Sequence, residues 1–180
     1  ASGTDALILA LKVAGIRPGD GVITTTYAPT PVPTAIVLAG GVPVFTDIEE
    51  ETCLMTAEAA EKKVCARARL IIAVHLFGSV CDMPSILRMA KKKGLTVIED
   101  CAQAHGSTFK GAMAGTFAEL ACFSFYPTKN LGGYGDGGII LTNDKKREHL
   151  LRMLRNYGKE KNPFDSEIPG YNSRLDELQA

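Results

Sequence analysis

Hydrophobic positions along the chain follow two alternating patterns. Stretches in which apolar residues recur at helical spacing predict helices between a Ser2 or Thr4 cap and Gly15, and over residues 30–39, 56–65, 83–93 and 144–154. Short apolar runs between them predict strands over residues 22–25, 42–45, 70–74, 95–98, 120–125 and 138–142. The run at 70–74 is unbroken, which is typical of a strand buried on both faces.

This alternation of strands and helices predicts βαβ units. The expected fold is therefore α/β, a three-layer sandwich with a mainly parallel mixed sheet covered by helices on both sides. Residues 156–173 are rich in Gly, Pro and Asn and predict a loop, after which a helix-like pattern begins. In such sheets ligands bind beyond the carboxyl ends of the strands, so site residues are expected there.

Composition narrows the classes of partner. Twenty basic residues balance twenty acidic ones, which argues against nucleic acid or an anionic membrane as a partner. No apolar run approaches the ~20 residues that a membrane-spanning helix needs. The five cysteines include no C-x-x-C pair and the three histidines are scattered, so neither a disulfide framework nor a zinc site is indicated. A cytoplasmic location is therefore expected.

The first candidate site residue is Asp100, which follows the predicted strand at 95–98. A carboxylate beside an apolar sheet needs a partner, because desolvation otherwise destabilises it. Taken alone, Asp100 is explained more simply as a cap of the following turn. His105 is near enough in the sequence to orient Asp100, although both His105 and His75 are interpreted as packed or hydrogen-bonded side chains and not as catalytic ones.

The second candidate is Lys129, which follows the strand at 120–125 and precedes a glycine-rich loop. Glycines let the backbone approach a ligand closely, and a desolvated lysine can attack carbonyl groups. The glycines fit G-x-G-x-x-G, but this pattern leads into a strand, whereas a dinucleotide fingerprint leads from a strand into a helix. A lone loop lysine is usually a solvated surface cation, so Lys129 by itself does not decide the function.

The third candidate is the segment Ser2-Gly3-Thr4-Asp5 at the amino end of the first predicted helix. Free N–H groups and the helix dipole favour a phosphate at such a position. A plain helix cap is the common alternative, and the phosphate interpretation gains weight only in combination with Asp100 and Lys129.

Together these motifs resemble those of the DegT/DnrJ family of sugar aminotransferases, which have fold type I and depend on pyridoxal 5′-phosphate (PLP). The resemblance covers essentially the whole chain. It is carried by Ser2-Gly3-Thr4, Pro43-Val44-Phe45, Val74-His75-Leu76-Phe77-Gly78, Glu99-Asp100-Cys101-Ala102-Gln103-Ala104-His105-Gly106, Phe123-Ser124-Phe125-Tyr126-Pro127-Thr128-Lys129-Asn130-Leu131-Gly132, Gly135-Asp136-Gly137-Gly138 and Tyr171-Asn172-Ser173-Arg174-Leu175-Asp176-Glu177-Leu178-Gln179-Ala180.

The resemblance implies catalytic roles for two residues. Lys129 would hold PLP as a Schiff base and later move a proton, and Asp100 would pair with the pyridine nitrogen. It also implies cofactor contacts for other residues. Those expected to bind the phosphate are Gly3, Thr4 and Ser124, with Asn172 reaching the phosphate of the partner subunit, while Gln103 lies against the oxygen side of the ring and Tyr27 supplies a stacking ring, since Pro29 occupies the family's usual aromatic position.

The activity implied by the resemblance is transfer of an amino group, from glutamate, to a nucleotide-linked keto-sugar, with ping-pong kinetics in a homodimer that shares its active sites. Residues 1–155 would form an N-terminally truncated PLP-binding large domain, and residues 156–180 a loop and the start of a helix leading to an absent C-terminal domain. The chain is thus expected to be an internal fragment that is poorly active alone. Two alternatives remain: a PLP- or sugar-binding regulator without turnover, and an α/β interaction domain in which Lys129 is a surface cation.

Overall fold

The computed structural model describes residues 1–162 and 164–180 and has an α/β architecture. Six strands form one sheet in the order β2-β1-β3-β4-β7-β8. The strands of this sheet are β1 Gly21–Thr25, β2 Val42–Thr46, β3 Ala68–Val74, β4 Thr96–Asp100, β7 Leu120–Ser124 and β8 Gly138–Leu141. All neighbouring strands pair in parallel except β7 and β8, which are antiparallel, so the predicted mainly parallel mixed sheet is confirmed.

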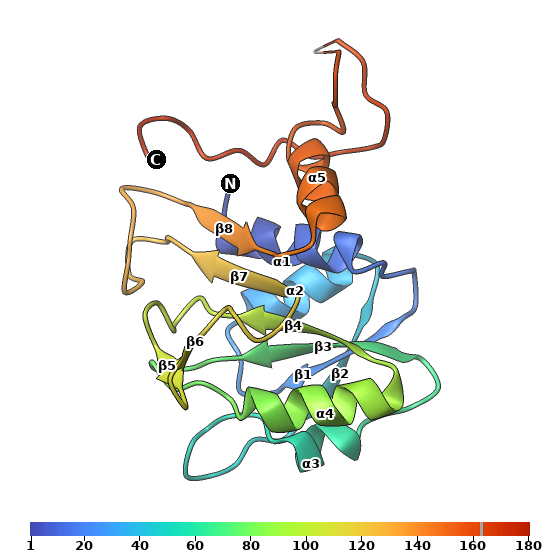
Figure 1. The fold of residues 1–180 in the computed structure, drawn as a ribbon, viewed down its shortest axis with the longest axis vertical. Helices are drawn as coiled ribbons and strands as arrows, with labels where there is room; N and C mark the ends of the chain where they lie inside the picture. The colour runs from blue at the N-terminus through green and yellow to red at the C-terminus, as the bar shows by residue number, and fades with distance from the viewer. Residues whose placement is uncertain (163) are drawn as a thin grey trace.

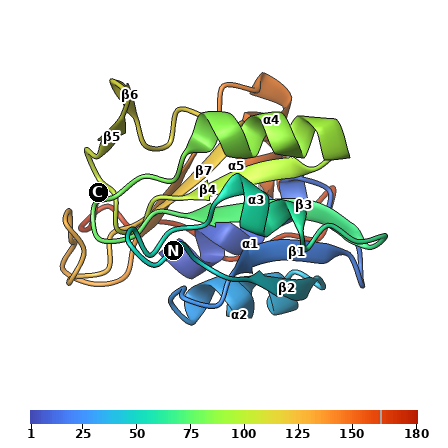
Figure 2. The same cartoon turned by 90° about the horizontal axis from the view of Figure 1, so that it is seen from below.

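Helices cover both faces of the sheet (Figures 1 and 2). They are α1 Gly3–Val13, α2 Pro31–Leu38, α3 Ala57–Glu61, α4 Met83–Lys93 and α5 Lys145–Leu154. α1 and α2 pack on one face and α3 and α4 on the other, which gives the three expected layers, and α5 packs beside α1. The carboxyl ends of the parallel strands meet at one edge of the sheet, where the candidate residues are found.

The hydrophobic core lies on both sides of the central strands. β1 is buried along its whole length and β3 everywhere except at Arg69, in agreement with the prediction of a strand buried on both faces. The edge strand β8 has alternate residues exposed, as expected for a strand with fewer neighbours. None of the helices in the described part of the chain is long and apolar enough to span a bilayer.

Local sequence signals set the ends of several helices as expected. The side chain of Ser2 caps α1 by accepting from the N–H of Asp5 at 3.1 Å, and Gly15 follows the helix with a φ of 85°. Such a left-handed φ suits glycine, which has no Cβ. Pro31 starts α2, where its missing N–H leaves no hydrogen bond unmade.

Two helix predictions were wrong in extent. The helix expected over 56–65 ends at Glu61, because the N–H groups of Lys63 and Val64 bond to the carbonyls three residues earlier and tighten the chain into turns. The helix-like pattern near the C-terminal end is a turn at residues 177–179, with one α-type bond from Ala180 N to Asp176 O at 3.1 Å. One such bond is only the nucleus of a helix, which is unfavourable by itself.

A small hairpin was not predicted. β5 Thr108–Phe109 and β6 Ala112–Met113 pair antiparallel outside the main sheet. Each strand is two residues long, which is too short for an alternating hydrophobic pattern to be recognised. The segment that follows this hairpin enters β7 and contacts the centre of the fold, as described below.

Candidate active site

The amino end of α1 lies against Ser124, the last residue of β7. A Cβ atom placed on Gly3 would lie 2.6 Å from the Cβ of Ser124, so only a glycine fits there without displacing the strand. The hydroxyl of Ser124 accepts from the N–H of Tyr126 at 3.3 Å, which leaves its own hydrogen free to donate. The first-turn N–H groups of Gly3 and Thr4 have no helical acceptor, as at every helix start. These donors form a cradle for an anion.

Asp100 is the last residue of β4 and is almost completely buried, with 5% of its surface exposed. One carboxylate oxygen accepts from the N–H of Ala102 at 3.0 Å. Burial raises the pKa of Asp100, and the bond from Ala102 and the positive charge of Lys129 only partly oppose this effect. An ionised Asp100 therefore gains strongly from a cationic partner in the cavity.

Lys129 lies in the turn that follows β7, where its N–H bonds to the carbonyl of Tyr126 at 2.8 Å. The residue is half-buried. Within the described part of the chain, its ammonium group has no ion pair or hydrogen bond, and it lines the same cavity as Asp100. A carboxylate and an amine from the ends of two neighbouring strands thus face one space.

This cavity has a volume of about 330 Å³. It brings together five of the predicted site residues, which are Gly3, Thr4, Asp100, Ser124 and Lys129. A larger hollow, of about 580 Å³, lies between α1, β8 and α5; Ser2 borders it, but none of the residues predicted to contact the cofactor does. The smaller cavity is the better candidate because its polar groups converge from separate elements.

Two other predicted residues line a neighbouring hollow of about 250 Å³. The side-chain oxygen of Gln103 accepts from the N–H of Phe77 at 3.2 Å, and the ring of Tyr27 lies 6.3 Å from the Phe77 ring. Pro29 lines both spaces. The structure therefore places Gln103 and Tyr27 beside the Asp100–Lys129 cavity and not among its lining residues.

Asn172 does not line the cavity of its own chain. It is exposed and forms an isolated β-bridge with Asn156. The suggestion that His105 orients Asp100 is not supported, because the His105 ring packs against Phe123 at 5.3 Å and Phe125 at 6.0 Å. Its position after the turn at 101–104 directs it toward these rings, and burial lowers its pKa.

Sequence reasoning missed two titratable lining residues. Cys122 is paired with Asp100 in the sheet and lines the cavity from β7, and Asp136 lines it from the glycine-rich loop. The alternation of strand side chains could have found Cys122, because it lies two residues before Ser124 and shares its face. Nothing in the local pattern distinguishes Asp136 from a solvated loop carboxylate.

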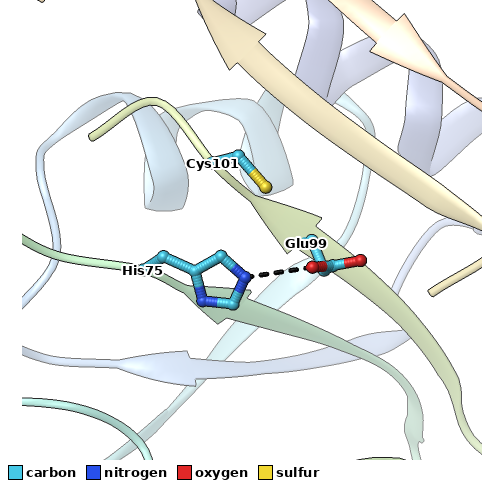
Figure 3. Close-up of side chains that lie close together, drawn as sticks. All are labelled: His75, Glu99 and Cys101. Atoms are coloured by element: carbon cyan, nitrogen blue, oxygen red, sulfur yellow. Dashed lines mark hydrogen bonds and ion pairs between the residues drawn. The ribbon is translucent and has the colours of Figure 1, made fainter. Parts of the chain in front are cut away.

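A second group of titratable residues lies on the opposite face of β4. His75, Glu99 and Cys101 are buried together, with the imidazole of His75 directed at the Glu99 carboxylate (Figure 3). The distance from His75 Nε2 to Glu99 Oε2 is 3.1 Å. The sequence did not reveal this cluster, because His75 follows β3 and only the parallel pairing of β3 with β4 brings it to Glu99.

The residues of the 330 Å³ cavity fit PLP group by group. The donors at the start of α1 and the Ser124 hydroxyl suit its phosphate, the Asp100 carboxylate suits its pyridine nitrogen, and the Lys129 amine suits its aldehyde carbon. Because Gly3 has no Cβ, the backbone at the start of α1 can come close to a phosphate. Fold and site together define a cofactor-binding domain of the type found in PLP-dependent transferases.

The chain belongs to the DegT/DnrJ/EryC1/StrS aminotransferase family, whose model matches residues 1–180. Aminotransferases of this family depend on PLP, and solved members include structures with the amino form of the cofactor, PMP. The predicted family and its cofactor class are therefore confirmed.

Individual relatives show how far the similarity extends. The chain is 47% identical over 180 residues to a UDP-N-acetyl-3-dehydro-alpha-D-glucosamine 3-aminotransferase of Acidithiobacillus ferrooxidans, of which it covers 48%. It is 45% identical over 179 residues to a pleiotropic regulatory protein of Geobacillus stearothermophilus, again covering 48%. The crystal structure of DesV from S. venezuelae in complex with a ketimine intermediate superimposes with a TM-score of 0.95 at 42% identity, covering 99% of this chain and 48% of that one. The chain thus spans about half the length of these relatives.

Proposed function

We propose that this chain forms the cofactor-binding part of a PLP-dependent aminotransferase that moves an amino group from glutamate to a nucleotide-linked keto-sugar. One observation carries the proposal: Asp100, Lys129 and the amino end of α1 line a single cavity although they come from distant parts of the chain. The printed name of the Acidithiobacillus relative, an aminotransferase acting on a UDP-linked sugar, supports the class of acceptor.

The proposed chemistry assigns each group a separate task. Bound PLP supplies an electron sink for the electrons left when a proton departs from the carbon that bears the amino group. Asp100 keeps a proton on the pyridine nitrogen, and its burial strengthens this pairing because the buried carboxylate has little other compensation. Lys129 would hold the cofactor through Nζ, and its amine would serve as the base and acid that moves the proton of the amino donor's α-carbon.

The remaining residues hold the cofactor in place. The N–H groups at the start of α1, the Thr4 side chain and the Ser124 hydroxyl bind the phosphate. Gln103 and Tyr27 line the neighbouring hollow, which shares Pro29 with the cavity, and would contact the ring from that side. Fixing the phosphate at one end and the pyridine nitrogen at the other orients the ring so that Lys129 meets the reacting carbon.

The assembly is part of the same proposal. Asn172 is exposed and lies outside the cavity of its own chain, which leaves it free to reach the phosphate in a partner subunit of a homodimer. Residues 1–155 serve as the PLP-binding large domain of a protein that works in the cytoplasm. Residues 156–180 connect to the rest of such a protein, whose relatives are about twice as long.

The test of the catalytic assignment is Lys129→Ala in the intact protein. The long-wavelength absorbance of covalently bound PLP should disappear, because no other amine lines the cavity within the described residues, and amino transfer should fall by at least about a thousandfold. The absorbance and transfer from glutamate to UDP- and dTDP-linked keto-sugars are measured for both proteins. Lys110→Ala, which removes an amine outside the cavity, should leave both unchanged. Retention of the absorbance band in Lys129→Ala would exclude this lysine as the attachment site.

A regulatory function without turnover is the second candidate, and it is favoured by the printed name of the Geobacillus relative. The same measurements separate the two functions. A regulator of this kind retains PLP through Lys129 but releases no 2-oxoglutarate from glutamate with any keto-sugar acceptor.

A further inference from the structure

Both ring nitrogens of His75 and both carboxylate oxygens of Glu99 form hydrogen bonds. Glu99 Oε2 accepts from His75 Nε2 at 3.1 Å and from Gly115 N at 2.8 Å, and Oε1 accepts from Phe117 N at 3.0 Å and Ala118 N at 2.7 Å. His75 Nδ1 accepts from Cys81 N at 3.3 Å. Because Nδ1 is an acceptor, the hydrogen of the neutral ring is on Nε2 and is donated to Glu99.

This bonding argues against a metal ion at the cluster. The ligand atoms of His75, Glu99 and Cys101 lie within 4.8 Å of one another, as in a metal site. The carboxylate oxygens of Glu99 and Nδ1 of His75 nevertheless already accept hydrogen bonds, so their lone pairs are not free to bind a cation. Burial also raises the pKa of the Cys101 thiol, which disfavours the thiolate that binds metals. The cluster is therefore a hydrogen-bonded structure and not an empty ligand set.

The pair connects the three strands that present the active site. Glu99 is in β4 immediately before Asp100, and the two side chains point to opposite faces of the sheet. The Glu99 carboxylate binds the loop that enters β7, the strand that ends at Ser124 and leads to Lys129. His75 follows β3, and its backbone N–H donates to the backbone carbonyl of Asp100 at 3.0 Å. Figure 3 shows how the His75 ring and the Glu99 carboxylate meet between these strands.

We propose that Glu99 and His75 are positioning residues, which fix the end of β4 relative to β3 and β7 and thereby set how the Asp100 carboxylate meets the pyridine nitrogen of PLP. This inference rests on the proposed function, because it requires PLP in the Asp100–Lys129 cavity. The carboxylate of Glu99 is held by four donors, so β4 has little freedom to rotate about its axis at this point. A rotation there would move Asp100 on the other face.

Two substitutions of His75 separate positioning from mere stabilisation. In His75→Asn the amide oxygen takes the place of Nδ1 and still accepts from Cys81 N, but the donor to Glu99 is lost. In His75→Gln the amide nitrogen takes the place of Nε2 and still donates to Glu99, but the acceptor for Cys81 N is lost. Each variant therefore removes one of the two bonds of the imidazole. Glu99→Gln replaces one carboxylate oxygen by an NH2 group, which cannot accept from the two donors that face that oxygen, so the four-donor arrangement is broken from the other side.

The experiment uses the intact protein. Tm is measured without cofactor. The PLP Kd, and the pH dependence of the absorbance of bound PLP, are measured with the cofactor added. Both His75 variants should lower Tm to a similar extent. Only His75→Asn and Glu99→Gln should weaken PLP binding, by about tenfold, and shift the pH at which the absorbance changes. His75→Gln should keep both wild-type values.

The outcomes distinguish the two proposals. If the wild-type protein binds no PLP, the proposed function itself fails. If the wild type binds PLP, and all three variants lower Tm but leave the PLP Kd and the pH dependence of the absorbance unchanged, the pair is only structural. If His75→Gln weakens PLP binding as much as His75→Asn, the bond to Glu99 is not the route by which Asp100 is positioned.

Discussion

Gly3 shows how much of the site depends on the size of one side chain. It begins α1, and its missing Cβ lets β7 approach until the Ser124 side chain touches the helix start. This contact joins the two groups of donors that suit a phosphate. The need for glycine here arises from close approach and not from its backbone freedom.

We expect Gly3→Ala to weaken PLP binding by about tenfold or more and to lower Tm. The added Cβ would lie 2.6 Å from the Cβ of Ser124, so helix and strand must separate. Alanine is ordinarily the better helix former by about 0.5–1 kcal/mol, so an uncrowded site would give the opposite change in stability. Titration with PLP and thermal unfolding measure the two effects. A higher Tm together with unchanged PLP affinity would show that the site has room for the methyl group.

The residue scale also shows which roles a sequence can reveal. Asp100 and Lys129 were candidates because each follows a predicted buried strand, but only their combination with the other motifs, and the family resemblance, gave them roles. Gln103 at the ring stays a prediction; in the structure its side chain bonds to the backbone of Phe77 beside a second hollow. That partner is 26 residues away and is set by the turn after β3.

Among the secondary-structure elements, α4 illustrates a helix whose limits follow from its own residues. Asp82 caps its start by accepting from the N–H of Ser85 at 3.2 Å, and Gly94 ends it with a φ of 68°. Burial alone would raise the pKa of Asp82, but the bonds from Ser85, together with the charges of Lys110 and Arg88, hold the pKa below its usual value. The helix covers the face of the sheet that contains Glu99 and His75.

We expect Asp82→Ala to lower the free energy of unfolding by about 1 kcal/mol, because it removes the side-chain acceptor at the helix start. Asp82→Asn keeps an acceptor and should lose no more than a few tenths of a kcal/mol. Denaturant unfolding of the cofactor-free proteins at neutral pH measures both. Equal losses in the two variants would mean that the charge of Asp82 contributes more than the cap.

At the scale of the whole molecule, the cavity exists only because long-range pairing brings separate segments together. The β4–β7 pairing places Asp100 beside Cys122, and the antiparallel β8 packs against the start of α1. The C-terminal segment also returns to this helix, where the Ser173 hydroxyl donates to Asp5 at 2.9 Å. The architecture thus buries the Asp100 carboxylate, although burial disfavours its ionised form.

We therefore expect Asp100→Asn to stabilise the cofactor-free protein by about 1 kcal/mol at neutral pH while weakening PLP binding. Burial raises the pKa of Asp100, so above the unfolded pKa of ~3.9 the folded state binds more protons and stability falls as pH rises. Asparagine carries no charge and still accepts from Ala102 N, so the gain should vanish as pH falls toward ~3.9.

Denaturant unfolding across this pH range measures the effect, and the control is Asp136→Asn, the same change at an exposed residue of the cavity. The control should leave stability unchanged. A destabilised Asp100→Asn protein at neutral pH would show that the ionised carboxylate is already compensated without a cofactor.

The amino-acid sequence by itself determined the order of helices and strands, the buried central strands, the helix cap at Ser2, and the positions of Asp100 and Lys129 after buried strands. These features depend on residues close together in the chain, whose spacing and hydrogen-bonding capacity are visible in the pattern. Only the tertiary structure decided the contact between Gly3 and Ser124, the bond of Gln103 to Phe77 and the His75–Glu99 pair. Each of these requires two segments that are brought together by sheet pairing and packing, and the local pattern carries no information about which distant partner a side chain will meet.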